Sequence, residues 1–162
     1  MAESTVELIL NYIEQHTTLV LATVGSDGVW ATPVFYVNRG FKLYFLSEAK
    51  TKHSRNLQLD EMIAAAITED CQEWQTIQGL QIQGRAYLVT SAAEKALALA
   101  AYLRKFPAVR HIFEAPSQFK GVIAARWHCI EPEILRLTDN SKGFGSRFEL
   151  NLNKGENASQ SE

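Results

Sequence analysis

Three β-prone segments near the N-terminus are separated by only two short turns, and this spacing constrains the fold more than any other feature of the sequence. The segments Thr17–Val24, Val29–Val37 and Phe41–Ser47 are rich in β-branched and aromatic residues. The intervening Ser26-Asp27-Gly28 and Asn38-Arg39-Gly40 are typical hairpin turns. Because such short turns join antiparallel strands, the three segments predict an antiparallel meander. Their continuous apolar character predicts strands that are covered on both faces, as in a barrel.

Helices and further strands are predicted in the rest of the chain. Ser4 with Glu7, and Ser91 with Glu94, have the spacing of a capping box, which marks a helix start. The predicted helices run from Ser4 to about His16, within Glu48–Leu59, and over Ser91–Lys105. The additional predicted strands are Met62–Thr68, Ile77–Thr90, and one or two within Val122–Leu137 with a break near Pro132. Six or seven strands with short early connections predict a small, mostly antiparallel barrel with peripheral helices.

Individual prolines and glycines predict irregular positions in this sheet. Pro33 lies inside the second strand and cannot donate a ladder hydrogen bond, so it predicts an edge strand, a bulge or a place where a ligand approaches the backbone. Gly79 and Gly84 predict bends or close approaches within one long strand.

The chain of 162 residues is expected to form a single domain over residues 1–150. The segment 151–162, NLNKGENASQSE, has almost no apolar side chains and is predicted to be disordered. The N-terminus lacks the layout of a signal peptide and no stretch is long and apolar enough for a membrane span, so a soluble cytoplasmic protein is expected.

Charge and cysteine content exclude several classes of protein. The 16 Lys and Arg against 18 Asp and Glu give a net charge of −2, which argues against a general nucleic-acid-binding surface. Cys71 and Cys129 fit neither a metal site nor a disulfide framework and are expected to be buried free thiols. The four histidines show no metal-site spacing, and no nucleophile elbow, Rossmann fingerprint or P-loop is present.

The densest basic cluster is Lys50-Thr51-Lys52-His53-Ser54-Arg55, directly after the third predicted strand. At a helix start, free amides and the helix dipole favour a phosphate, and Thr51, Ser54 and Lys52 would add hydroxyl and ammonium donors. A solvated basic turn is the alternative interpretation of the same pattern.

The order of these features resembles the pyridoxamine 5′-phosphate oxidase-like, FMN-binding split-barrel family. The matching stretches are Gly28–Val37 with Leu43–Ser47, Thr51–Leu57, Gly79–Ala86, and Thr138–Phe148, the last resembling an uncharacterised branch. The resemblance implies a six-stranded antiparallel split β-barrel that forms a homodimer, with one FMN in each of two clefts at the interface.

The resemblance also implies roles for individual residues. The strand residues expected along the isoalloxazine ring and ribityl chain are Thr32, Pro33, Val34, Phe35 and Tyr36. The residues expected to hold the phosphate are Ser47, Thr51, Lys52 and His53, with Lys52 as the main counter-charge. Gln81 is expected to reach the ring edge, and Arg147 to contact the flavin from the other subunit.

The chain departs from the family at the substrate site. The oxidases have an arginine where Thr32 stands, and an Arg-x-His stretch where this chain reads Gly143-Phe144-Gly145. His53 also stands where a lysine or arginine is usual. We therefore predict an FMN-dependent oxidoreductase acting on an unknown small substrate other than pyridoxamine phosphate, without assigning a catalytic residue. The alternatives are a flavin carrier or sensor without turnover, and a haem or deazaflavin binder in which His53 or His128 could serve as a ligand.

Overall fold

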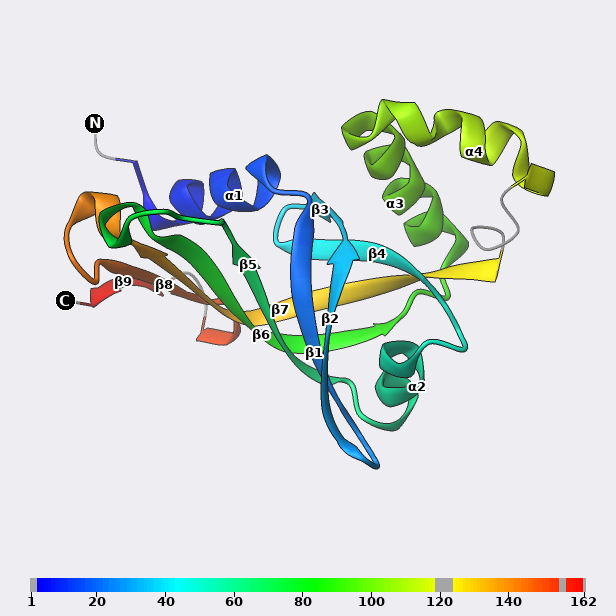
Figure 1. Cartoon of the computed structure of the whole chain (residues 1–162), viewed down its shortest axis with the longest axis horizontal. Helices are drawn as coiled ribbons and strands as arrows, with labels where there is room; N and C mark the ends of the chain where they lie inside the picture. The colour runs from blue at the N-terminus through cyan, green and yellow to red at the C-terminus, as the bar shows by residue number, and fades with distance from the viewer. Residues whose placement is uncertain (1–2, 119–123, 155–156, 162) are drawn as a thin grey trace.

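The computed structural model describes residues 3–118, 124–154 and 157–161, and their strands form one antiparallel sheet that curls around a core (Figure 1). Hydrogen-bonded neighbours run in the order β2-β1-β5-β6-β7-β4-β3, while β8 pairs with β7 and β9 with β8. The strands are β1 (Thr18–Gly25), β2 (Gly28–Phe35), β3 (Val37–Arg39), β4 (Lys42–Glu48), β5 (Met62–Thr68), β6 (Gln78–Leu88), β7 (Ala125–Asp139), β8 (Arg147–Asn151) and β9 (Asn157–Ser161). The α-helices are α1 (Thr5–Gln15), α2 (Lys52–Leu59), α3 (Ala92–Lys105) and α4 (Arg110–Glu114). The predicted antiparallel β architecture with peripheral helices is confirmed.

The strand β7 links the two ends of the molecule. Its first part, Ala125 to Ile130, pairs with β4, and its later part, Ile134 to Thr138, pairs with β8 on the same edge. The opposite edge pairs with β6. Figure 1 shows β7 crossing from the α4 side to the β8 side. At about 3.3 Å per residue, a strand of 15 residues spans up to about 50 Å.

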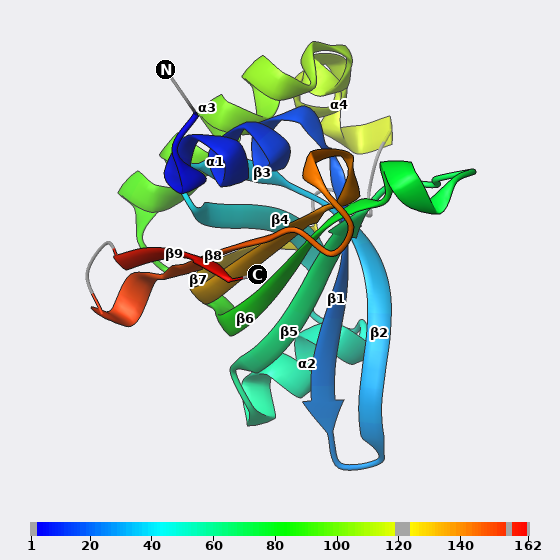
Figure 2. The same ribbon diagram turned by 90° about the vertical axis from the view of Figure 1, so that its left-hand side faces the viewer.

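Both predicted turns join antiparallel strands, β1 with β2 and β3 with β4, but the three predicted segments do not form one meander. β1 and β2 form a hairpin around a turn in which Gly28 has φ +113°, and Figure 2 shows it extending beyond the rest of the sheet. The predicted strand Val29–Val37, however, divides at Tyr36 into β2 and β3. Tyr36 N–H donates to Thr17 O at 2.9 Å, and the chain then leaves β1 and pairs with β4. β2 and β3 therefore lie at opposite ends of the strand order, and β4 is not a direct neighbour of β2.

The prolines and glycines of the sheet occupy irregular positions. Pro33 lies on β2, at an edge of the described sheet, as predicted. Pro132 does not break its strand: β7 continues through it, and a register shift beside it leaves Glu133 without an opposite residue on β6. At this bulge Gly84 faces Pro132, and a Cβ on Gly84 would lie 2.3 Å from Glu131 O. The predicted close approach at Gly84 is confirmed.

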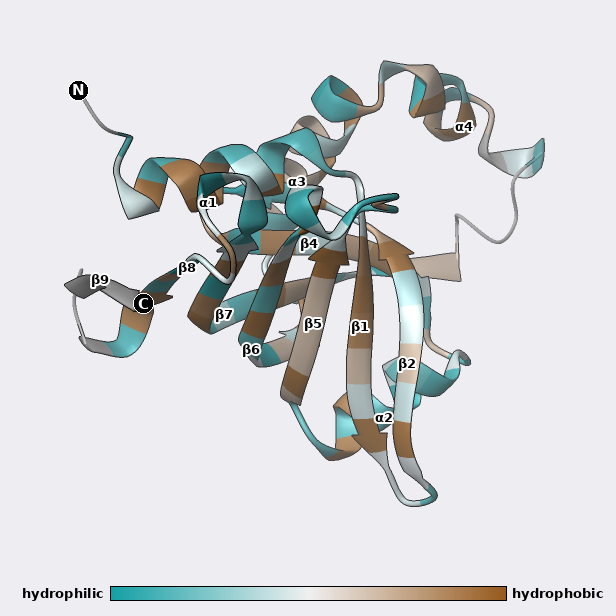
Figure 3. Ribbon diagram, turned by 60° about the vertical axis from the view of Figure 1, so that its left-hand side comes forward, coloured by the Kyte–Doolittle hydropathy of each residue, from teal (hydrophilic) through white to brown (hydrophobic). Residues whose placement is uncertain are grey.

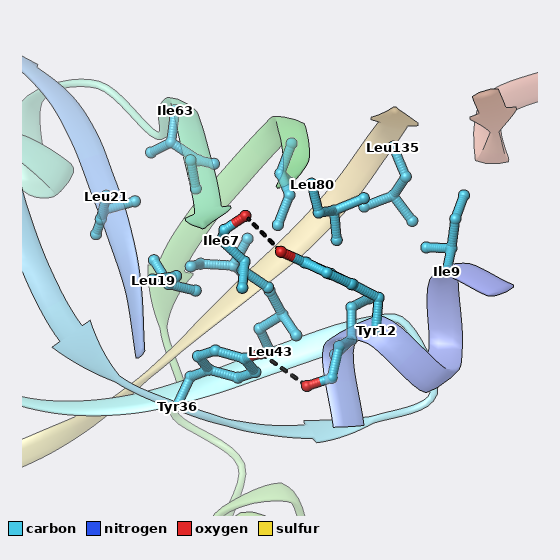
Figure 4. Close-up of a cluster of buried hydrophobic side chains, with 14 of the residues drawn as sticks. Ile9, Tyr12, Leu19, Leu21, Tyr36, Leu43, Ile63, Ile67, Leu80 and Leu135 are labelled. Atoms are coloured by element: carbon cyan, nitrogen blue, oxygen red, sulfur yellow. Dashed lines mark hydrogen bonds between the residues drawn. The ribbon is translucent and has the colours of Figure 1, made fainter. Parts of the chain in front are cut away.

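The main core lies between the sheet and α1 (Figure 4). The predicted capping box of α1 is confirmed, because Ser4 N–H donates to Glu7 Oε2 at 2.8 Å and Glu7 N–H donates to Ser4 Oγ at 3.2 Å. Figure 4 shows the rings of Tyr12 and Tyr36 among buried aliphatic side chains. Tyr36 is fully buried, and its hydroxyl donates to Ile13 O at 2.7 Å. This bond links Tyr36, the residue between β2 and β3, to helix α1.

A second buried cluster lies beneath α3. Its members are Val37, Tyr44, Val89, Ala98, Ala101, Trp127 and Cys129. Ser91 caps α3 by accepting from Glu94 N–H at 3.3 Å, but the reciprocal half of the predicted capping box does not form. The Glu94 carboxylate instead accepts a hydrogen bond from the Tyr44 hydroxyl at 2.9 Å. Tyr44 is buried, so this bond gives its hydroxyl the partner that a buried polar group needs. Cys129 is buried as predicted, whereas Cys71 is partly exposed and donates to Thr76 O at 3.5 Å.

Two strands lie toward the C-terminus of the described chain. β8 extends to Asn151, and residues 157–161 form β9 along its edge. No helix in the described ranges combines the length and hydropathy that a membrane span requires.

Candidate functional site

The junction between β4 and α2 gathers hydroxyl and imidazole groups. Thr51 caps α2, and its Oγ1 accepts from Ser54 N–H at 3.3 Å. Ser47 Oγ, near the end of β4, lies 2.6 Å from His53 Nε2 and 3.0 Å from Thr51 Oγ1. The Thr51 hydroxyl is also 2.8 Å from Ser54 Oγ. One strand end and the first turn of one helix thus place four polar side chains in a single hydrogen-bonded cluster.

The imidazole in this cluster is buried. His53 is 9% exposed, and burial lowers its pKa below the ordinary 6.5, so the ring is neutral at pH 7. Its centroid lies 6.2 Å from that of Phe45, which also stacks on His128 at 5.0 Å with 12° between the rings. Two neutral histidines therefore flank one phenylalanine of β4. Among the described residues, no group of three or more His, Cys, Asp or Glu side chains is placed to hold a metal ion.

A pocket of about 410 Å³ opens beside this junction, and we call it the β2–α2 pocket. Its lining residues are Pro33, Val34 and Phe35 of β2, Leu46, Ser47 and Glu48 of β4, Thr51, His53, Tyr102, Val109, Ile112, Phe113 and Ala125. Hydroxyl and imidazole groups form one part of the wall, and aliphatic and aromatic side chains form the rest. The volume lies in the range of small-molecule sites. The structure thus brings six of the predicted site residues into one pocket.

Lys52, the predicted main counter-charge, does not line this pocket. Its ammonium lies 2.8 Å from Asp27 Oδ2 in the β1–β2 turn and 4.7 Å from the centre of the Trp30 ring. The hydrogen bond from Lys52 lowers the pKa of the Asp27 carboxyl. Within the described lining of the pocket, Glu48 alone is charged, and it pairs with Lys50 at 2.8 Å.

Four other predicted residues also lie outside the pocket. Thr32 is half-buried on β2 beside the lining residues, and the Tyr36 side chain points into the core toward α1. Gln81 and Arg147 are exposed and pair with Arg136 and Thr138, in the later part of β7. Along β7, the partner of Arg147 is about 40 Å from the end that lines the pocket. Gln81 lies closer to the pocket, because across the sheet it is three strands, about 14 Å, from Pro33 through Ala66 and Val20.

The aromatic wall of the pocket is missing from the sequence-based prediction. Nothing in the sequence indicates that Tyr102, Val109, Ile112 and Phe113 cover the same ligand space. Helix α4 has only five residues, so its periodicity carries little signal. The contacts that dock this region are tertiary, such as the edge-to-face pair of Tyr102 and Phe113 with centroids 6.5 Å apart.

Comparison with known families settles the membership of the chain. A family model described as pyridoxamine 5′-phosphate oxidase matches residues 6–135. The chain belongs to the pyridoxamine 5′-phosphate oxidase family. The resemblance inferred from the sequence motifs is thereby confirmed at the level of family and fold.

Proteins similar to this chain in sequence or fold carry names that describe different ligands or none. A UPF0306 protein of Yersinia pseudotuberculosis is 27% identical over 143 residues, covering 87% of this chain and 89% of the relative. A haem-binding protein from Mycobacterium smegmatis has a TM-score of 0.73 at 20% identity, covering 93% of this chain and 59% of that protein. An FAD-binding protein from Mesorhizobium loti has a TM-score of 0.62 at 12% identity, covering 80% and 91% of the two chains. These structural likenesses establish a shared fold.

Proposed function

We propose that this protein is an FMN-binding oxidoreductase, with the flavin phosphate at the start of α2 and the flavin ring along β2. The main support is that one pocket, the β2–α2 pocket, is lined both by the strand segment Pro33–Phe35 and by the cluster of Ser47, Thr51 and His53. A strand with an unpaired outer edge can lie along a flat ring, and a helix start can hold an anion.

The start of α2 has donors that suit a phosphate. Thr51 uses its side chain to cap the amide of Ser54, while the amides of Lys52 and His53 have no hydrogen-bond partner among the described residues. The Ser47 hydroxyl adds a further donor at the same place, whereas the Thr51 hydroxyl donates to Glu48 O at 2.9 Å. Backbone amides and hydroxyls of this kind recur in phosphate sites.

The start of α2 has few positive charges to pair with the FMN phosphate. His53 is neutral because it is buried, so it supplies a hydrogen bond rather than a positive charge. Lys52 supplies a charge once its ammonium turns from Asp27 toward the phosphate. Both partners of that ion pair are partly exposed, so the exchange is inexpensive. We therefore expect FMN to bind, with Lys52 as the only full positive charge on its phosphate from the described part of this chain.

The proposal includes a homodimer whose clefts lie at the interface. The outer face of the sheet exposes apolar side chains, with Val20 41%, Val24 45%, Val29 75% and Met62 64% exposed. Figure 3 shows β5 hydrophobic along its length, whereas β6 alternates between hydrophobic and hydrophilic residues. An apolar face of this kind favours a partner. A second subunit would also bring Arg147 to a flavin bound by the first, as the family resemblance implies.

The bound flavin would supply the redox chemistry by accepting and returning electrons. The protein residues would bind the phosphate, hold the ring against β2 and exclude water with the wall of Tyr102, Ile112 and Phe113. Pyridoxamine phosphate is disfavoured as the substrate, because Thr32 replaces the family arginine and the described lining of the pocket includes no cationic side chain. We propose a small substrate without a phosphate group.

The absorbance spectrum of the purified protein, followed by titration with FMN, tests the proposal. We expect flavin bands, and a protein purified without flavin should bind FMN in the micromolar range or tighter. Absence of binding at about 50 µM FMN, an affinity weaker than about −6 kcal/mol, would reject it. Bleaching of the bound flavin by NADH or NADPH under anaerobic conditions supports turnover, whereas an inert flavin favours the carrier or sensor.

Haem is the second candidate ligand, because His53 and His128 are neutral and buried and the Mycobacterium smegmatis protein of similar fold is named as haem-binding. A Soret band that shifts when haemin is added, together with no response to FMN, would favour haem. Loss of that shift in His53→Ala or His128→Ala would identify the ligand.

A further inference from the structure

A second pocket, of about 310 Å³, lies beside α2, and its described lining has no residue in common with that of the β2–α2 pocket. We call it the β7–α2 pocket. Its lining residues are Ala49, Ser54, Leu57, Gln58, Leu59, Glu61, Tyr87, Leu88, Arg126 and His128. Nothing in the proposed flavin site uses these side chains.

His128 lines this pocket and carries an open acceptor. Its Nδ1 lies 3.0 Å from the Arg126 carbonyl oxygen, which can only accept, so Nδ1 carries the proton. Burial, with 4% of the side chain exposed, lowers the pKa of the ring and keeps it neutral, so Nε2 has a free lone pair. Nε2 has no hydrogen-bond partner among the described residues. Stacking on Phe45 fixes the plane of the ring.

Arg126 and Ser54 add two further polar groups. The Arg126 guanidinium is exposed and forms no ion pair with any described residue, whereas Glu61, the carboxylate in the lining, lies 3.9 Å from Arg85. Ser54 is 2% exposed, and its Oγ lies 2.8 Å from the Thr51 hydroxyl, which also donates to Glu48 O at 2.9 Å. The pocket therefore offers a neutral acceptor on His128 and a cation on Arg126, beside the Ser54 hydroxyl and the Glu61 carboxylate.

Apolar side chains form the rest of the wall. Leu57, Leu59 and Leu88 surround the polar groups, and the Tyr87 ring adds a flat surface. This combination selects a ligand with an apolar, flat body and polar groups at its ends, because a few placed polar groups fix orientation within an apolar site.

We propose that the β7–α2 pocket binds a small aromatic carboxylate that also carries a hydroxyl group. The guanidinium of Arg126 pairs with the carboxylate, for which its planar fork is suited. The ligand hydroxyl donates to His128 Nε2, and the leucines and Tyr87 cover the ring. The volume is at the lower end of small-molecule sites, which favours a single-ring ligand over a haem macrocycle.

The test uses 4-hydroxybenzoate and benzoate as probes, with calorimetry and ligand-observed NMR. We expect 4-hydroxybenzoate to bind more tightly than benzoate by about tenfold, because only the former donates to Nε2. Arg126→Gln should weaken both probes by about tenfold or more, and Arg126→Lys should recover part of the loss. His128→Phe keeps the stack on Phe45 and should remove only the preference for the hydroxyl.

Three results would overturn the proposal. One is absence of binding of either probe at about 5 mM, and another is equal binding by the parent protein and Arg126→Gln. The third is a haemin Soret shift that His128→Phe abolishes, which would assign the pocket to haem. Arg126 is exposed, so its variants should fold even if His128→Phe does not. FMN titration of the same variants separates this proposal from the flavin proposal, because FMN affinity should stay within about twofold whether or not the benzoates bind.

Discussion

Two glycines on the same strand provide a matched test of how the sheet is built. Gly84 and Gly79 both lie on β6, and both are predicted from the sequence to be bends or close approaches. A Cβ on Gly84 would lie 2.3 Å from Glu131 O and 2.9 Å from Pro132 Cα, and both of these are backbone atoms of β7. A Cβ on Gly79 would have Ile67 O as its nearest neighbour, at an ordinary 3.6 Å.

The magnitudes follow from these distances. Relieving the contact at Gly84 requires β6 and β7 to separate by about 1 Å at the bulge, so Gly84→Ala should cost about 3 kcal/mol, the upper end of the usual overpacking range. At about 2–4 °C per kcal/mol for a chain of this size, the melting temperature should fall by about 6–12 °C. Gly79→Ala should be neutral or stabilise by up to about 1 kcal/mol, because alanine restricts the unfolded chain.

Thermal and urea unfolding followed by circular dichroism measure both variants against the parent protein. Equal unfolding free energies for the two variants, within about 0.5 kcal/mol, would refute the claim that the bulge at Pro132 requires a glycine opposite it. If Gly79→Ala is destabilised and Gly84→Ala is not, the close contact between strands lies at Gly79 rather than at Gly84.

Two further predictions concern the ligand site and pH. Lys52→Ala should weaken FMN binding by tenfold or more, because a charge-assisted hydrogen bond contributes about 1.5–3 kcal/mol. Riboflavin lacks the phosphate and should bind as before. Equal losses of affinity for both ligands in fluorescence titrations would show that Lys52 has a structural role. The buried His53 and His128 have pKa values below 6.5, so below about pH 6.5 the unfolded chain binds protons that the folded chain does not. Stability that is fully present above that pH should decline as the pH falls, and less steeply in His128→Gln; urea midpoints that do not fall between about pH 7.5 and 5.5 would contradict this.

Local features of the fold could be predicted from the sequence because each depends on neighbouring residues. The α1 capping box joins residues three positions apart, and the β1–β2 turn requires the positive φ that Gly28 adopts. The helix start at Thr51 follows from the same short-range chemistry. The order of such features along the chain is enough by itself to indicate the family.

Partner choice in the sheet could not be predicted in this way. The division of one predicted strand at Tyr36 depends on hydrogen bonds to Thr17 O and Ile13 O, which no local pattern specifies. The continuity of β7 through Pro132 depends on the missing side chain of Gly84, on another strand. In both cases a long-range contact replaces the local preference.

The turns, the helix starts, the balanced charge and the concentration of hydroxyl and basic residues around Thr51 all follow from the amino-acid sequence alone. How those groups are used depends on the tertiary structure. It turns Lys52 toward Asp27, buries His53 and His128 in neutral form, and places Gln81 and Arg147 at the far end of β7. The physical reason is that capping and turn formation act over three or four residues, whereas burial, charge pairing and the shape of a pocket depend on segments that meet only in the folded chain.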